Sequence, residues 1–245
     1  MSNFPFQRLQ ADLSALIAHT PAGQRLVSEP ELAKQLGVSR ATLREAMRTF
    51  ETQGLIRRRQ GSGTFVVGKV QALDSGLEVL ESLETMAKRL GLEVSVSDLS
   101  IEPIASDDEL AAALNVSSGA PLTRVRRVVR ADNRPVAYLV DTLPVKVLRF
   151  EDLPADFHGS VLDFLLGRGD SVTSSRANVS AIGATAEVAR ALEIQRGDVL
   201  LHFYSQLFDN NGKIVDYSLS YFIPGYFHFH ILRRVGADQL QRPQR

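Results

Sequence analysis

Hydrophobic residues recur at helical spacing in three successive segments of the first 53 residues. The first segment runs from Phe6 to Ile17 and ends at HTPAG, where proline and glycine break a helix. The second, SEPELAKQLG, has Ser28 as a candidate N-cap, Glu31 at the capping-box position and Gly37 at its end. Only GVS separates it from the third segment. Two helices joined by a short turn that contains glycine predict a helix-turn-helix.

The third helix is predicted to run from Arg40 to about Gln53, with Ser39 as its N-cap. Its buried face is predicted from residues at i, i+3, i+4 and i+7, namely Leu43, Ala46, Met47 and Phe50. Arg44 and Arg48 then face outward. Arginines near the start of a recognition helix contact bases and phosphates, but arginines beside acids are also typical of an ordinary solvated helix face.

A basic hairpin follows this helix. Ile56–Arg59 and Thr64–Val67 have strand-like patterns and are joined by QGSG, whose glycines permit a tight turn. The hairpin carries three consecutive arginines, and its bare tip can approach a sugar-phosphate backbone closely. Helices, turn and hairpin together predict a winged helix-turn-helix over residues 1–68 and favour DNA binding over the solvated-face alternative.

The rest of the chain alternates between strand and helix patterns. Residues 69–78 are predicted to be a linker, short enough to couple what lies on either side. Residues 79–245 contain two hairpins, which turn at ADNRP and DNNG, mixed with short amphipathic helices. This pattern predicts a second domain built on an antiparallel sheet. The fold class is therefore α+β, with a winged helix-turn-helix joined to an antiparallel sheet domain with short helices.

Composition adds a charge asymmetry to this picture. Residues 1–68 hold nine basic and five acidic residues, although the 245-residue chain as a whole has zero net charge. Such asymmetry is typical of a nucleic-acid-binding module joined to another domain, and uneven surface charge without a function is the alternative. The chain has no cysteine, no basic-then-apolar leader and no membrane-length apolar run, so we expect a cytoplasmic protein with no membrane association.

The segment SEPELAKQLGVSRATLREAMRTFETQGLIRRRQGSGTFV resembles the DNA-binding domain of the GntR family of bacterial transcription regulators. The resemblance implies contacts to double-stranded DNA from the recognition helix and from the tip of the wing. With the outward arginine of the helix and one from the wing, the predicted DNA-binding residues are Ser39, Arg40, Thr42, Arg44, Arg48, Arg58, Gln60 and Gly61. Pro30 replaces an arginine that often contacts DNA in the family, and Val27 replaces a proline.

The second domain resembles the UTRA ligand-sensing domain of the HutC subfamily, whose fold is similar to chorismate lyase. The resemblance is carried by RRVVRADNRPVAY, SVLDFL, VARALEIQRGDVLL and FDNNGKIVDYSLSYF. It implies a small-molecule effector site that includes Arg127, Ser160 and Asp216. Relatives that sense phosphorylated sugars have a glutamate at the position of Leu139, and Asp141 lies two residues on, on the same side of a strand.

The effector site also departs from those relatives in charge. A second arginine is replaced by Val129, and Glu81 lies in the early loop that binds phosphate in some relatives. Fewer cations and more carboxylates favour an uncharged, hydroxyl-rich or amine-bearing effector over a phosphorylated one. Structural alternatives remain for every candidate. Arg127 is also compatible with a solvated sheet edge, the two aspartates with capping of strand ends, and Ser160 with an N-cap.

We therefore expect a ligand-responsive repressor that binds a pseudo-palindromic operator as a homodimer, with half-sites about one helical turn apart. The last hairpin and YFHFHILRRV are candidates for the dimer interface. No catalytic constellation and no cofactor motif is predicted, and His228 and His230 have no third metal ligand at suitable spacing, so no metal site is predicted. The alternatives are a lyase-like domain that turns over its ligand and an architectural DNA-binding protein that senses nothing.

Overall fold

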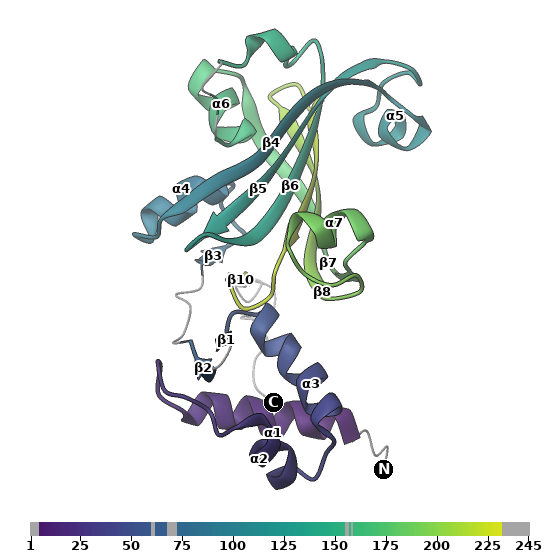
Figure 1. Cartoon of the computed structure of the whole chain (residues 1–245). Coiled ribbons are helices and arrows are strands. Elements are labelled where there is room, and N and C mark those ends of the chain that lie inside the picture. The colour runs from purple at the N-terminus through teal and green to yellow at the C-terminus, as the bar shows by residue number, and fades with distance from the viewer. Residues whose placement is uncertain (1–4, 60–61, 68–72, 155–156, 158, 232–245) are drawn as a thin grey trace, which may run out of the picture.

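The computed structural model describes residues 5–59, 62–67, 73–154, 157 and 159–231. The chain forms a small helical unit and a larger sheet unit with separate hydrophobic cores (Figure 1). The elements of the helical unit are α1 (Pro5–His19), α2 (Glu29–Gln35), α3 (Arg40–Thr52), β1 (Ile56–Arg59) and β2 (Gly63–Val66). The predicted helix-turn-helix and its basic hairpin are both present.

The core of the helical unit forms around α3. The four residues predicted for its apolar face are all buried, and they pack against Leu13 of α1 and Leu32 of α2. The Ser39 hydroxyl caps the helix by accepting a hydrogen bond from the backbone N–H of Thr42 at 3.1 Å. Strands β1 and β2 pair antiparallel, with Ile56 opposite Val66.

The capping box predicted for the second helix was wrong. Ser28 occupies the N-cap position of α2, but its side chain accepts no capping hydrogen bond. Pro30 stands in the first turn. Because proline has no backbone N–H, it removes one of the donors that a capping side chain would accept from.

The sheet unit contains a six-stranded antiparallel sheet in the order β4-β5-β6-β9-β8-β7. Its strands are β4 (Val94–Ala105), β5 (Pro121–Ala131), β6 (Arg134–Pro144), β7 (Val172–Gly183), β8 (Val199–Asp209) and β9 (Ile214–Phe222). Both predicted hairpins are present. In the ADNRP turn, Asp132 and Asn133 have φ angles of 49° and 61°, the left-handed conformation of a tight hairpin turn.

Helices cover both faces of this sheet, as Figure 1 shows. They are α4 (Leu83–Arg89), α5 (Asp108–Leu114), η1 (Phe150–Asp152), α6 (Val161–Arg168) and α7 (Ala186–Ala191). Helices α4 and α6 lie on the face that carries Arg127, whereas α7 lies on the opposite face, where its Glu187 accepts a hydrogen bond from Tyr138. The predicted α+β architecture is confirmed.

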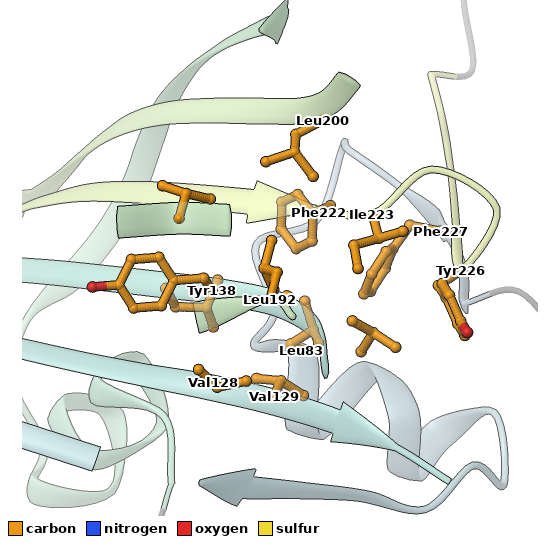
Figure 2. Packing of buried hydrophobic residues seen from close by; sticks show 14 of the residues in the cluster. Leu83, Val128, Val129, Tyr138, Leu192, Leu200, Phe222, Ile223, Tyr226 and Phe227 are labelled. Carbon is orange, nitrogen blue, oxygen red and sulfur yellow. The ribbon is translucent and has the colours of Figure 1, made fainter. Parts of the chain in front are cut away.

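The segment predicted as a linker contains a short strand. Strand β3 (Leu73–Gly76) pairs in parallel with β10 (Phe227–His230). This pair lies between the large sheet and α3 (Figure 1). Figure 2 shows Phe222, Ile223 and Phe227 packed together in the cluster that also contains Leu83 of α4. Strand β10, near the C-terminal end of the sheet unit, is thereby paired with β3, in the segment that leads into this unit from the helical unit.

Candidate DNA-binding and effector sites

The first turn of α3 presents the residues predicted to contact DNA. Ser39, Arg40, Thr42 and Arg44 are all exposed. The hydroxyl groups of Ser39 and Thr42 lie 2.8 Å apart, so the cap also holds Thr42 in position. The buried stripe behind this turn fixes its orientation, and these polar side chains form an open surface at the positive end of the helix dipole.

Acidic residues of the same unit pair with two of the predicted DNA-binding arginines. The Arg44 Nε donates to Glu29 at 2.6 Å, although the Arg44 side chain remains 57% exposed. The Arg58 Nε lies 3.5 Å from a carboxylate oxygen of Glu51, and its Nη2 donates to the carbonyl of Arg44 at 3.1 Å. Because Arg44 is mostly exposed, its ion pair contributes little stability, and a phosphate can replace the Glu29 carboxylate at low cost. Gln60 and Gly61 lie outside the described residues.

Arg48 is placed differently from the other arginines of the helix. Its Nη1 donates to Asp198 at 2.6 Å, in the turn before β8, and its Nη2 donates to Glu45 at 2.9 Å. The predicted outward face of α3 therefore contacts the sheet unit at its C-terminal end. The side chains are 25% and 12% exposed for Arg48 and Asp198, so this ion pair is partly shielded from water.

Two glycines also lie where the two units come into close contact. A Cβ atom on Gly54 would lie 2.3 Å from the Tyr226 hydroxyl oxygen, and one on Gly225 would lie 2.8 Å from the Gln53 carbonyl oxygen. Both glycines also have positive φ angles, 70° and 100°. Larger residues at either position would strain the backbone and push the units apart.

Arg127 forms the centre of a buried charged cluster in the sheet unit. It lies on β5 between β4 and β6, with only 4% of its surface exposed, so the solvated-edge alternative was wrong. Its guanidinium forms an ion pair with Asp141, on β6, and its Nε lies 3.5 Å from a carboxylate oxygen of Glu84, on α4. Burial acts to lower the pKa of Arg127, but the carboxylates of Asp141 and Glu84 outweigh it and raise the pKa above its ordinary value.

Asp216 adds a third carboxyl group to this cluster. It lies on β9, is 5% exposed and accepts a hydrogen bond from the backbone N–H of Thr142 at 3.1 Å. Burial and the nearby negative charge of Asp141 raise the pKa of Asp216 well above its ordinary value. Asp141 itself lies within β6, opposite Ser218 of β9, and does not cap a strand end. The sheet therefore brings Arg127, Asp141 and Asp216 together.

Ser160 lies at the start of α6 and caps it. Its hydroxyl accepts a hydrogen bond from the backbone N–H of Asp163 at 3.2 Å, as the N-cap alternative predicts. The Asp163 carboxylate in turn accepts from the Ser82 hydroxyl at 2.5 Å and from the Thr85 hydroxyl at 3.2 Å. Ser82 caps α4, the helix that carries Glu84. The N-termini of α6 and α4 are thus hydrogen-bonded to each other, and this contact connects Ser160 to the helix that carries Glu84.

Glu84 is the residue that sequence reasoning missed. Both of its carboxylate oxygens are buried, and within the described part of the chain neither accepts a hydrogen bond, although the Nε of Arg127 lies 3.5 Å from one of them. Glu81, the acid predicted in the early loop of the effector site, instead forms an ion pair with Arg89 at 2.5 Å. A signal was present, because Ser82 followed by an acid in the next turn is typical of a helix start and would have placed Glu84 on α4.

The described part of the chain offers no group of three or more His, Cys, Asp and Glu side chains arranged to hold a metal ion. His228 and His230 lie on β10, whose backbone pairs with β3. Of the helices the structure describes, none is long and apolar enough to cross a membrane.

Comparison with known families and structures places both units. Residues 6–66 match the model of the bacterial regulatory proteins of the gntR family, and residues 89–228 match the UTRA domain. The chain is 30% identical over 197 residues to the HTH-type transcriptional repressor NagR of Bacillus subtilis. This match covers 80% of this chain and 79% of NagR. It is 29% identical over 181 residues to the histidine utilization repressor of Pseudomonas putida, covering 74% and 72% of the two chains.

Solved structures show the same fold. The crystal structure of PhnF from Mycobacterium smegmatis superposes with a TM-score of 0.64 and 22% identity, covering 93% of this chain and 100% of that one. The helix-turn-helix unit and the sheet unit thus occur together in one known fold. The chain belongs to the gntR family of bacterial regulatory proteins and carries a UTRA domain as its second unit.

Proposed function

We propose that this protein is a ligand-responsive transcriptional repressor that acts on DNA in the cytoplasm. The observation that carries the proposal is the double use of α3. Its first turn exposes Ser39, Arg40 and Thr42, whereas Arg48 and Gly54, which follows the end of the helix, contact the UTRA domain. A ligand that changes the position of the UTRA domain therefore acts directly on the DNA-reading helix. Relatives named as repressors support the direction of the effect.

We further propose how the DNA surface works. Arg40, Arg44 and the hydroxyls of Ser39 and Thr42 contact base edges and phosphates, while Arg58 and the wing tip at Gln60 and Gly61 contact the backbone. One such surface covers a short half-site, so a homodimer binds a pseudo-palindromic operator with half-sites about one helical turn apart. Arg48 joins the DNA contacts when it exchanges Asp198 for a phosphate.

The effector is proposed to bind at the cluster of Arg127, Asp141, Asp216 and Ser160. One guanidinium faces the carboxyl groups of Asp141 and Glu84, with Asp216 beside them. A phosphate dianion would add negative charge where cations are already outnumbered. Hydroxyl or ammonium groups would instead donate to the carboxylate oxygens of Glu84, which have no donor in the structure. An uncharged, hydroxyl-rich or amine-bearing metabolite fits this chemistry.

A two-step experiment tests the proposal. The full chain is screened by thermal shift against polyols, amines and sugar phosphates, and each stabilising compound is added to binding assays with an operator selected from genomic DNA fragments. We expect polyols or amines to stabilise the protein and to weaken operator binding by at least tenfold. Stabilisation by sugar phosphates alone would contradict the effector class, and stabilisation with unchanged operator binding would contradict the regulatory role. Chemical conversion of the compound would favour the lyase-like alternative.

A further inference from the structure

The two faces of the wing, the hairpin of β1 and β2, carry arginines with different partners. Ile56 is buried in the core of the helical unit, and Arg58, two residues on, donates to the Arg44 carbonyl of α3. Because side chains alternate along a strand, Arg57 and Arg59 lie on the opposite, outer face. Arg58 is paired with acids, whereas within the described part of the chain no acidic side chain pairs with Arg57 or Arg59. The outer face therefore holds uncompensated positive charge.

A third arginine reaches this outer face from outside the hairpin. Arg25, in the segment before α2, is exposed and forms a β-bridge with Phe65 of β2. A Cβ atom on Gly63, which lies on the same face as Phe65, would be 2.4 Å from the Arg25 Nε. The missing side chain of Gly63 thus lets the Arg25 guanidinium lie against β2. Gly63 is paired with Arg59, so the two guanidinium groups approach the same end of the hairpin.

An open hollow of about 320 Å³ lies on the outer face of the wing. Arg57, Arg59 and Phe65 line it, and none of its described lining residues is acidic. The Arg59 guanidinium lies over the Phe65 ring, 5.2 Å from its centroid, and this cation–π contact helps to orient it. A phosphate that enters the hollow can accept two hydrogen bonds from one guanidinium and offsets the repulsion between neighbouring arginines. The hollow therefore suits phosphate groups.

We propose that Arg25, Arg57 and Arg59 bind phosphates of the DNA just outside the half-site that α3 reads. The inference rests on the operator binding of the proposed function and extends the contacts beyond the half-site. When the tip of a wing enters a groove, its two faces turn toward the two phosphate backbones that border the groove. The face that carries Arg58 is joined to α3 and faces the half-site, which leaves the outer face toward the flanking sequence. Duplex DNA carries one negative charge per roughly 1.7 Å of its axis, so several phosphates lie within reach.

A comparison of two duplex lengths tests this placement. The full chain is titrated against the operator trimmed to its half-sites and against the same operator extended by about one helical turn on each side, at several salt concentrations. We expect the wild type to bind the extended duplex about tenfold more tightly and with a steeper salt dependence. Arg57→Gln/Arg59→Gln should lose this gain while its unfolding stays cooperative. Its slope of log affinity against log salt should fall by about one unit for each phosphate contact removed.

Two matched variants keep the outcome interpretable. Arg57→Lys/Arg59→Lys preserves the positive charge and should retain most of the gain from the longer duplex. Lys146→Gln/Lys213→Gln removes the same charge from exposed positions of the sheet unit and should bind both duplexes as the wild type does.

Three results would contradict the inference or its basis. A wild type that gains nothing from the longer duplex, or an Arg57→Gln/Arg59→Gln variant that keeps the whole gain, would overturn the flanking contacts. An equal loss of affinity on both duplexes would also overturn them, because it would place the two arginines within the half-site. A wild type that binds neither duplex specifically would instead overturn the operator binding of the proposed function.

Discussion

Arg44 and Arg127 present the same guanidinium group to opposite surroundings. Arg44 is 57% exposed and bonds Glu29 at the rim of the DNA-binding surface, whereas Arg127 is 4% exposed and is enclosed by carboxyl groups. An exposed ion pair is worth little and exchanges easily, whereas a buried charge that loses its partner is strongly destabilising. The first arrangement suits a site that trades a carboxylate for a phosphate, and the second suits a site that holds its shape until a ligand enters.

The largest effect is expected at the buried end of this comparison. Arg127→Ala leaves the carboxyl groups of Asp141 and Glu84 without their cation, which should cost about 3–5 kcal/mol of unfolding free energy. Urea unfolding of the full chain measures this loss. Arg127→Lys is the matched control, since it restores the charge, and it should recover part of the stability. Equal stability of wild type and Arg127→Ala would show that the guanidinium does not stabilise these buried carboxyl groups.

The exposed arginines should show the reverse pattern. Arg40→Ala with Arg44→Ala should reduce operator binding by at least about 100-fold, because each side chain contributes on the order of 1–3 kcal/mol to base or phosphate contacts. Unfolding free energy should change by less than about 1 kcal/mol. Fluorescence anisotropy at several salt concentrations measures the affinity, and circular dichroism checks the fold. Specific operator binding that survives in the double variant would remove this turn from the recognition surface.

The stability contributed by the buried cluster should depend on pH through Asp216. Its pKa is raised in the folded state, so the folded protein binds a proton more tightly than the unfolded chain does. This contribution to stability is fully present below about pH 4, near the ordinary pKa of aspartate, and is lost as pH rises through the raised value. Asp216→Asn cannot ionise, so its stability relative to wild type should increase with pH. Urea unfolding at a series of pH values measures this, and a difference that does not vary with pH would contradict it.

The same side chain has a predicted functional role. Because Asp216 lies beside Asp141 and Arg127 in the proposed effector site, Asp216→Ala should shift the effector dose response to higher concentration while operator binding without effector stays unchanged. An unaltered dose response would exclude Asp216 from the site. The screen for stabilising compounds supplies the effector for this measurement.

The smallest effect is expected at Arg48, whose side-chain exposure lies between those of Arg44 and Arg127. Asp198→Asn should cost less than about 1 kcal/mol of stability, since the pair is partly exposed. It frees Arg48 for a phosphate, so the slope of log affinity against log salt should become steeper by about one unit. Glu45→Gln is the comparison variant. It removes the partner of Arg48 within α3 and leaves the ion pair of Arg48 with Asp198, between the two units, in place. If both variants give the wild-type slope, Arg48 does not reach DNA.

The sequence predicted most of the fold because each element carries a local signal. Periodicity placed α3 and its four buried residues, and turn residues placed both hairpins of the sheet. The pairing of β3 with β10 was missed, because it joins residues about 150 positions apart and neither short strand has a pattern that specifies its partner. Glu84 and the contact of Arg48 with Asp198 were missed for a related reason. Both depend on how separate elements dock, which no local spacing encodes.

Helix α3 separates its tasks along its length. The residues proposed to read DNA bases lie at its start, up to Arg44, whereas the residues that contact the UTRA domain, Arg48 and Gly54, lie toward and beyond its other end. About two turns of helix, residues 45–52, lie between Arg44 and the following glycine turn that contacts Tyr226. Substitutions in the first turn can therefore redirect the regulator to a new operator without altering how it responds to its ligand. Duplicated copies of such a gene could diverge in their targets while sharing one signal.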